Sequence, residues 1–333
     1  MRMRKKILVT GAGGRAAVTF MSSLTEPGLE LHAADADPYA PGLYLVSGEQ
    51  RHLLPHTTHP EYVTSVLALC LEHGIDALVP TAESELLPMA RRREDFAKVG
   101  VRLLCASERM LQACQDRWEL LQACAFDVTV PKTGLWTEQL RWSDCFPCVV
   151  KPRHRGSGRV PVRVDDRAKL AACARSPGLL IQEYLAGEEV SVHLFVGADG
   201  TVHGAVPTRR LRVAAGLTVT SQTLFDRQII KLAYAAVRTM QLRGAVHIEF
   251  RRDRFGTARL LDISPCFVGD MALTAKAGVN IPQLALDELF GQPLPSDPLR
   301  FQEIAMTCTF QSTVIPAFDI TAMERQRAGY RTL

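Results

Sequence analysis

The sequence predicts an α/β domain with a parallel sheet, followed by an α+β domain whose strands form hairpins. In the first part, short apolar runs alternate with stretches of helical periodicity, a pattern typical of parallel strands joined by helical crossovers. In the second part, apolar runs flank turn residues at 198–200 and 253–256, which indicates antiparallel hairpins. With 333 residues, the chain is long enough for about two domains. We expect them over 1–106 and 107–310, followed by a peripheral or frayed C-terminal tail over 311–333.

The first domain is expected to begin with a strand that ends in glycines. Apolar runs predict its strands at 6–10, 29–34, 75–79 and 101–104. A helix is predicted between Pro60 and Gly74, because apolar residues recur there at helical spacing, namely Val63, Val66, Leu67, Cys70 and Leu71. A further helix is predicted over 84–98. This order of elements is that of a small doubly wound domain.

The second domain is expected to begin with one helix over 108–125, where apolar residues lie three or four apart. The elements predicted after it are a strand at 146–151, a helix over 166–175, a strand at 179–184, a hairpin of 190–196 and 202–206, a helix over 225–240, and a hairpin of 246–250 and 258–263. Hairpin strands with helices on one side are typical of an α+β domain.

Composition and charge exclude several classes of protein. Hydrophobic residues make up 47% and charged residues 22% of the chain, as in folded globular proteins. The net charge of +4, from 39 basic and 35 acidic residues, is too balanced for a nucleic-acid binder, and no apolar run is long enough to span a membrane. The nine cysteines are spread along the chain, which favours a reducing compartment. We therefore expect a cytoplasmic protein without nucleic-acid or membrane partners.

A glycine-rich turn follows the first predicted strand. The segment Gly11-Ala12-Gly13-Gly14-Arg15-Ala16 opens a helix, and Asp35 follows about twenty residues later, which satisfies the dinucleotide-binding fingerprint. Such glycines let backbone amides approach a phosphate at the helix N-terminus. This favours an NAD(P)-dependent oxidoreductase. A tight turn from strand to helix needs small residues whatever the ligand, so both interpretations stay open.

Charged residues of the second half indicate a nucleoside triphosphate and magnesium. Lys151 ends an apolar strand just before a loop, 153–159, that carries three arginines and two glycines. Glu249 and Asp262 lie among apolar neighbours on adjacent strands of a predicted hairpin. Two facing carboxylates repel each other unless a cation lies between them, and Mg²⁺ prefers such a pair completed by water and phosphate oxygens. The alternatives are a solvated basic turn and two exposed carboxylates.

The order of these motifs resembles the ATP-grasp superfamily, in particular its carbamoyl-phosphate-synthase-like branch of stand-alone ligases. The resemblance covers about residues 108–310 and rests on five segments: Asp116-Arg117-Trp118, Phe146 to Arg153 with the Gly-Ser-Gly loop, Ile181 to Val192, Glu249, and Leu261 to Pro265. It implies a pre-ATP-grasp, Rossmann-like domain over 1–106 and a two-lobed ATP-grasp domain over 107–310. The lid lobe is expected at about 126–185 and the metal-binding lobe at about 186–310.

The resemblance implies ATP and Mg²⁺ as cofactors, and it implies a role for each matching residue. Arg117 and Lys151 would hold the triphosphate, under a flexible lid that contains Arg153, Gly156, Ser157 and Gly158. Glu183, Tyr184 and Leu185 would meet the adenine edge, and Glu189 would bind the ribose hydroxyls. The implied metal ligands are Glu249, Asp262 and Ser264.

One segment departs from the family pattern. Where the family has Glu-x-Asn-Pro-Arg, this chain has Asp262-Ile263-Ser264-Pro265-Cys266. Ser264 offers a weaker neutral oxygen to the metal, and Cys266 removes a cation that would face the acyl phosphate. We hypothesise that Arg210 or Arg212 binds the substrate carboxylate or the transferring phosphoryl group instead; the alternative is a solvent-facing basic strand.

The resemblance implies an ATP- and Mg²⁺-dependent ligase that activates a small carboxylic acid, such as an amino acid or related metabolite, as an acyl phosphate for attack by an amine. It also allows a homodimer. Two alternatives stay open, namely a non-catalytic ATP-binding protein of the same fold and the NAD(P)-dependent oxidoreductase. Histidines are expected outside this chemistry: His247 on the strand face opposite Glu249, and His52, His56 and His59 on the surface.

Overall fold

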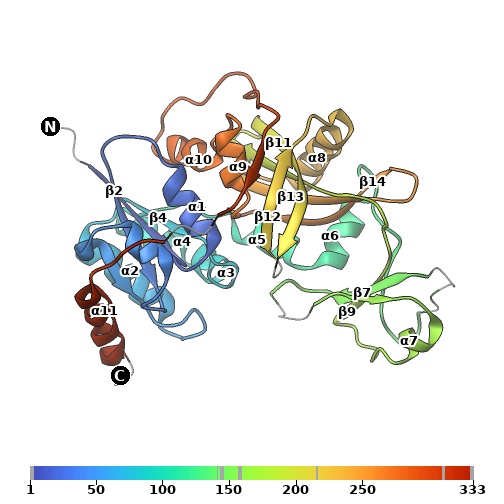
Figure 1. The fold of residues 1–333 in the computed structure, drawn as a ribbon, viewed down its shortest axis with the longest axis horizontal. Helices are drawn as coiled ribbons and strands as arrows, with labels where there is room; N and C mark the ends of the chain where they lie inside the picture. Colours follow the sequence, from blue (N-terminus) through green and yellow to red (C-terminus); the bar gives the residue numbers. More distant parts are fainter. Residues whose placement is uncertain are drawn as a thin grey trace.

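The computed structural model describes residues 4–140, 142, 146–156, 160–214, 217–309 and 312–330. The chain forms an N-terminal domain around one sheet, a large second sheet in the middle of the molecule, and a small third sheet at the opposite end (Figure 1). The predicted succession of an α/β part and an α+β part is confirmed. Among the described residues, no helix combines the length and the apolar composition that crossing a bilayer requires.

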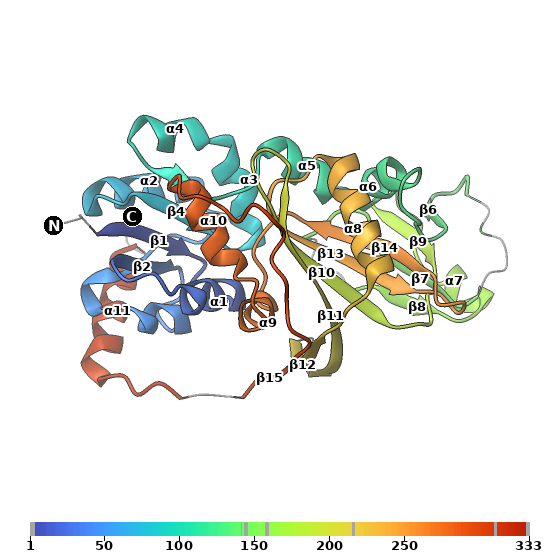
Figure 2. The same ribbon diagram turned by 90° about the horizontal axis from the view of Figure 1, so that it is seen from above.

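The first sheet is parallel, with the strand order β3-β2-β1-β4-β5. Its strands are β1 (Lys5–Thr10), β2 (Leu29–Asp35), β3 (Arg51–Leu53), β4 (Ala77–Pro80) and β5 (Arg102–Leu103). Its helices are α1 (Arg15–Ser23), α2 (Tyr62–His73), α3 (Glu83–Arg91) and α4 (Arg93–Lys98). Because side chains alternate along β1, Ile7 and Val9 pack toward α1, whereas Leu8 packs toward α2 and α4 on the other face (Figure 2).

The second sheet has six strands in the order β14-β13-β10-β11-β12-β15, and all its pairings within the described residues are antiparallel. Its strands are β10 (Glu189–Val196), β11 (Val202–Ala214), β12 (Leu217–Thr223), β13 (Gly244–Arg252), β14 (Ala258–Ser264) and β15 (Ala305–Thr307). Helices α5 (Glu108–Gln115), α6 (Arg117–Cys124) and α8 (Arg227–Met240) cover one face and share an apolar core with Val192 and Ile248. By alternation, His193 and His247 lie on the other face.

The third sheet is small and antiparallel, with the order β6-β9-β7-β8. It consists of β6 (Thr133–Leu135), β7 (Cys148–Pro152), β8 (Val162–Val164) and β9 (Leu179–Glu183), with the short helix α7 (Arg167–Ala171). Its residues have a core of their own around Trp136, Val150 and Ile181. It forms a separate lobe at the end of the molecule farthest from the N-terminal domain (Figure 1).

Two helices that we expected to be continuous are broken. The helix predicted over 84–98 divides at Arg92 into α3 and α4, and α4 then buries Phe96. The helix predicted over 108–125 divides at Asp116, whose backbone is extended and forms a bridge with His154. The Asp116 side chain accepts hydrogen bonds from the backbone N–H groups of Trp118 and Glu119, so it ends α5 and caps α6. Helical spacing alone does not reveal these caps.

The segments after Gly269 return to the N-terminal domain. Helices α9 (Met271–Lys276) and α10 (Ile281–Leu289) pack between the second sheet and α1. The C-terminal segment is not frayed over 317–330, because it forms helix α11 (Ala317–Tyr330). This helix lies at the periphery, against β3, where Asp319 pairs with Arg51 at 2.7 Å and Met323 is buried.

Candidate functional site

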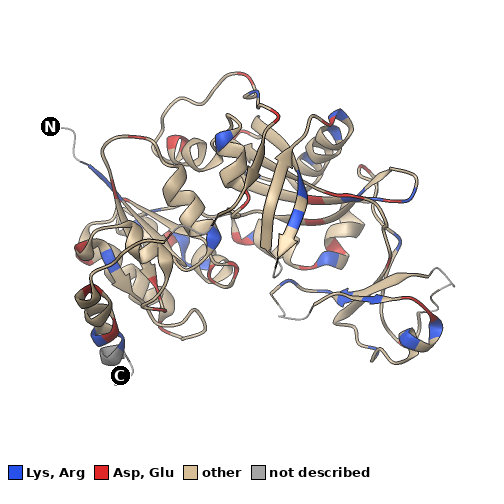
Figure 3. Ribbon diagram, viewed as in Figure 1, with Lys and Arg blue, Asp and Glu red and all other residues tan. Residues whose placement is uncertain are grey.

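A cleft of about 360 Å³ lies between the second and third sheets. Figure 3 shows basic segments on the small sheet and both basic and acidic segments on the neighbouring strands of the large one. Nine of the residues singled out from the sequence line this cleft: Arg117, Lys151, Glu183, Tyr184, Leu185, Glu189, Arg210, Glu249 and Asp262. They come from both sheets and from the start of α6, so only the tertiary fold brings them together.

The two carboxylates lie opposite each other on β13 and β14. Glu249 pairs with Asp262 in the strand register, and the next pair is Phe250 with Leu260. This register leaves Leu261 as an extra residue, a β-bulge, so that Leu261 and Asp262 both line the cleft while Leu260 and Ile263 enter the core. Asp262 is nearly buried, with 6% of its surface exposed. The bulge therefore determines that the second carboxylate faces the first.

Two arginines hold the Asp262 carboxylate. Arg117 Nε and Arg155 Nη1 each lie 3.0 Å from Asp262 Oδ2, and Arg155 Nε also donates to Glu83 at 2.8 Å. Burial would lower the pKa of Arg155, but the charges of Asp262 and Glu83 raise it above its usual value, so the guanidinium stays charged. Arg155 was not among the individually predicted site residues. Its position inside the arginine-rich loop was the only sequence feature that pointed to it.

Glu249 is held ionised by the groups around it. His247 Nε2 lies 3.1 Å and Arg210 Nη2 lies 3.6 Å from Glu249 Oε1. Burial raises the pKa of Glu249, but the hydrogen bond with His247 and the charges of His247, Arg210 and Arg155 lower it to about 2. The prediction that His247 points away from Glu249 is wrong, because residues two apart on a strand share a face.

Lys151 lies on β7 with only 8% of its surface exposed. Burial lowers the pKa of its ammonium group to about 8; Asp262 and Glu249 oppose this shift, and the charge of Arg117 adds to it. Arg210 lies on the facing sheet, where it pairs with Glu189 at 2.9 Å and approaches Asp270 to 3.9 Å. The cleft is thus lined by paired cations and carboxylates rather than by charges of one sign.

Three other predicted residues that the structure describes, Arg153, Gly156 and Arg212, do not line this cleft. Arg153 instead pairs with Asp116 at 2.7 Å. Gly156 lies in an exposed turn with φ 70, and Ser157 and Gly158 lie outside the described residues. Arg212 is exposed: the register of β11 shifts between Arg210 and Arg212, so these two residues do not share the face that regular alternation would give them.

Ser264, the proposed third metal ligand, lies in a neighbouring pocket of about 50 Å³. Glu83, Arg155 and Cys266 line the same small pocket. Burial raises the pKa of the Cys266 thiol to about 11, which makes this cysteine a poor nucleophile at neutral pH. Residue 266 is a cysteine and supplies no positive charge. The Arg155 guanidinium, from the loop after β7, supplies one in the same pocket.

The glycine-rich turn after β1 is occupied by the chain itself. Asp35 Oδ2 accepts the Gly13 N–H at 2.7 Å, and Gly42 N–H donates to Ala12 O at 2.9 Å. A Cβ at Gly42 would lie 2.3 Å from Ala12 O, so the segment after β2 packs closely over the turn. The glycines therefore have a structural explanation that needs no dinucleotide.

Comparisons with known proteins agree with this fold. Residues 7–104 match the family model of the PylC-like N-terminal domain, and residues 175–309 match a model described as ATP-grasp in the biosynthetic pathway with Ter operon. Comparison with curated proteins finds no significant match.

Several solved structures share the architecture. Biotin carboxylase from Campylobacter jejuni, solved with β,γ-ATP, is 16% identical with a TM-score of 0.70 over 89% of this chain and 73% of that one. An L-amino acid ligase from Bacillus licheniformis is 18% identical, with a TM-score of 0.67 over 87% and 75% of the two chains. N5-carboxyaminoimidazole synthetase from Staphylococcus aureus is 14% identical, with a TM-score of 0.70 over 92% and 83%. Residues 7–104 and 175–309 are thus each similar to one of the two families, and the chain as a whole shares the fold of these solved enzymes.

Proposed function

We propose that this chain is an ATP- and Mg²⁺-dependent ligase of the carbamoyl-phosphate-synthase-like branch. It would join a small carboxylic acid, an amino acid or related metabolite, to an amine. One observation carries the proposal: Glu249 and Asp262 face each other across β13 and β14 in the same cleft as Lys151 and Arg117. The proposed setting is the cytoplasm, with small-molecule substrates and the chain acting alone or as a homodimer.

The side chains of the cleft fit a divalent ion and a triphosphate. Hard carboxylate oxygens are the protein ligands that Mg²⁺ prefers, and Glu249 and Asp262 supply them from neighbouring strands. The guanidinium groups of Arg117 and Arg155 already bind a carboxylate oxygen, so they offer donors of the geometry that phosphate oxygens accept. We assign Glu249 and Asp262 to the metal, and Arg117 and Lys151 to the phosphates.

The other end of the cleft suits the nucleoside. Glu183, Tyr184 and Leu185 follow one another where β9 ends, and Leu185 is nearly buried. We assign these three residues to the adenine edge. Glu189 begins β10 on the facing sheet, and its carboxylate, now paired with Arg210, would accept hydrogen bonds from the ribose hydroxyls.

Magnesium-bound ATP would supply a γ-phosphoryl group to a carboxylate oxygen of the acid, with release of ADP, and the amine would then displace phosphate and lose a proton. The chain's own residues would neutralise the charge that two anions bring together. Arg155 contacts Asp262 and Arg210 approaches Glu249, so each would offset negative charge of the reacting groups. Besides Arg210 and Arg212, which the sequence suggested, we propose Arg155 as a cation that compensates for Cys266, because it lines the same pocket as Cys266.

A second candidate is a protein that binds ATP without turning it over. It is favoured by the position of Ser264, which lines a separate small pocket, and by the two arginines that already neutralise Asp262. A site with fewer metal ligands can bind nucleotide and still transfer the phosphoryl group poorly.

Measuring ADP release over pools of carboxylic acids and amines tests both candidates. The ligase predicts a pair of substrates that stimulates ADP release by the native chain and not by Glu249→Gln. Binding of ATP without ADP release from any pair would establish the second candidate. A thermal shift with NAD(P)H and none with Mg²⁺ and ATP would contradict both and restore the oxidoreductase.

A further inference from the structure

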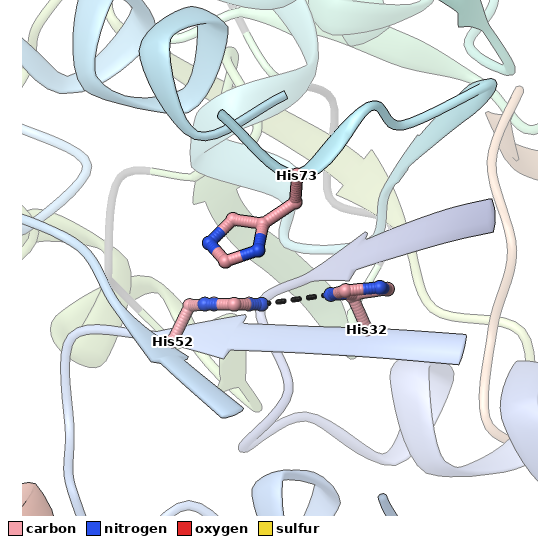
Figure 4. A group of neighbouring side chains, drawn as sticks. All are labelled: His32, His52 and His73. Atoms are coloured by element: carbon pink, nitrogen blue, oxygen red, sulfur yellow. Dashed lines mark hydrogen bonds between the residues drawn. The ribbon is translucent and has the colours of Figure 1, made fainter. Parts of the chain in front are cut away.

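Three histidines from distant parts of the N-terminal domain meet at one edge of its sheet (Figure 4). His32 lies on β2, His52 lies on the neighbouring β3, and His73 is the last residue of α2. The prediction that His52 is a surface residue is wrong, because β3 pairs with β2 and buries it; His56 and His59 are exposed as expected. The cluster lies in a different sheet from the cleft carboxylates.

One ring nitrogen from each of the three histidines lies close to those of the other two. His32 Nδ1 and His52 Nε2 lie 2.9 Å apart, and one nitrogen from each of the three rings lies within 4.8 Å of the others. The His73 ring stands over the pair, with its centroid 4.4 Å from that of His52 and 5.5 Å from that of His32 (Figure 4). Three imidazoles bound to one tetrahedral ion through bonds of about 2.0–2.1 Å have nitrogens about 3.3–3.4 Å apart, so an ion would have to move the His32 and His52 nitrogens apart by a few tenths of an ångström.

The outer nitrogen of His32 is oriented by a carboxylate. Glu30 Oε1 lies 3.1 Å from His32 Nε2, and Lys6 in turn pairs with Glu30 at 3.5 Å. Metal-bound histidines commonly donate their second N–H to a carboxylate, which fixes the tautomer and leaves the first nitrogen free to bind the ion. With Nε2 protonated toward Glu30, His32 Nδ1 accepts the hydrogen bond from His52 Nε2, and a metal ion would replace this hydrogen bond once His52 carries its proton on Nδ1.

Burial disfavours protonation of two of these histidines, His32 and His52, and an unprotonated imidazole nitrogen is what binds a metal ion. Burial lowers the pKa of His52 to about 3, and it also lowers the pKa of His32, so both rings are neutral at pH 7. His73 is only half-buried, so one side of the cluster is close to solvent.

We propose that His32, His52 and His73 form a binding site for one divalent transition-metal ion of the zinc class. Neutral imidazoles suit Zn²⁺, Co²⁺ and Ni²⁺, and the three leave one position of a tetrahedral ion for water. The ion would connect β2, the three-residue edge strand β3 and the C-terminal end of α2. Its role would be to stabilise the N-terminal domain, separately from the magnesium ions of the cleft.

Cobalt titration tests the site directly, because tetrahedral Co²⁺ absorbs visible light far more strongly, and at longer wavelength, than octahedral Co²⁺ does. The titration uses the full chain with excess Mg²⁺. We expect one equivalent of tetrahedral Co²⁺, displaced by Zn²⁺, together with a Zn²⁺-dependent rise in melting temperature. His73→Gln is the most informative variant, because it alters a half-buried residue at the end of a helix and leaves the buried pair intact.

Variants of the cluster and of residues outside it show whether Co²⁺ binds at the three histidines. We expect loss of the tetrahedral bands in His73→Gln, and Glu30→Gln should weaken binding of Co²⁺ by about 10- to 100-fold.

The double variant His56→Gln/His59→Gln changes exposed histidines outside the cluster and should bind Co²⁺ normally. The variant Glu249→Gln/Asp262→Asn removes both carboxylates that we assign to the cleft metal and should also bind Co²⁺ normally at the histidines. Absence of tetrahedral Co²⁺ from the native chain, unchanged bands in His73→Gln, or loss of the bands in the cleft variant would overturn the proposal.

Discussion

The chain has two places that resemble nucleotide sites, and they are built in opposite ways. The glycine turn at 11–14 is contiguous and complete in the sequence, yet Asp35 and the segment around Gly42 occupy it in the structure. The cleft between the second and third sheets has no contiguous motif, and its pair of Arg117 and Asp262 joins residues 145 positions apart. A glycine-rich backbone motif can be needed only to form a tight turn. Two carboxylates paired across strands, in contrast, repel each other unless a cation lies near them.

The largest expected effect separates these two places. Asp262→Asn should lower substrate-stimulated ADP release by about 10³-fold, because loss of a metal ligand removes several kcal/mol of charge stabilisation. Asp35→Asn keeps the shape of a residue that serves the turn only, so we expect ADP release to stay within about twofold of the native value. Equal loss in both variants would place the turn within the nucleotide site.

A second prediction sharpens the description of the cleft. Arg210 contacts Glu189 and Glu249, whereas Arg212, two residues further along β11, is exposed. Arg210→Ala should lower kcat by about 10- to 100-fold while ATP binding persists, because it removes a cation from the reacting anions. Arg212→Ala should leave kcat unchanged. Steady-state kinetics and ATP titration of both variants check this, and equal effects would show that the bulge does not separate the two arginines.

A third prediction concerns the turn itself. Gly42→Ala would place a Cβ at 2.3 Å from Ala12 O, so the backbone must shift, and we expect a loss of about 1–3 kcal/mol in the free energy of unfolding. Gly48→Ala is the matched control, because a Cβ there meets nothing within 4 Å. Denaturant unfolding measures both variants. A stable Gly42→Ala would mean that the turn is looser than its hydrogen bonds indicate.

The smallest expected effect is on the pH dependence of nucleotide binding. The pKa of Lys151 is about 8 in the free protein, so above that pH the amine must take up a proton to bind phosphate as an ammonium. ATP affinity should therefore fall as pH rises through about 8, by up to about tenfold per unit. Glu249, with a pKa of about 2, stays ionised throughout this range. Calorimetric titration at several pH values measures the effect.

The matched control for the pH effect is Lys151→Arg. A guanidinium stays charged over this range, so the affinity of the variant should not follow pH. A profile that is equally steep in both proteins would assign the titration to another group.

The parts of the site predicted from the sequence share a property: they depend on neighbours along the chain. The presence of Glu249 and Asp262 on the two strands of one hairpin follows from its short turn, and Lys151 follows from an apolar strand that ends at a charged loop; the direct pairing of the carboxylates depends on the bulge at Leu261. The sequence did not reveal the cap formed by Asp116, the reach of Arg155 to Asp262, or the burial of His52. The cap is formed with near neighbours along the chain but leaves no periodic signal, whereas the other two depend on partners far away in the chain.

The sequence by itself determined the order of the elements and the hairpin that carries the two carboxylates, because apolar periodicity and hairpin turns act over a few residues. Only the tertiary structure decided which charges meet those carboxylates and which face of β11 each arginine takes. Three histidines on two strands and a helix also met only in the folded chain. The physical reason is that ion pairs and metal ligands form across space, where the fold places side chains within about 4 Å regardless of their separation in sequence.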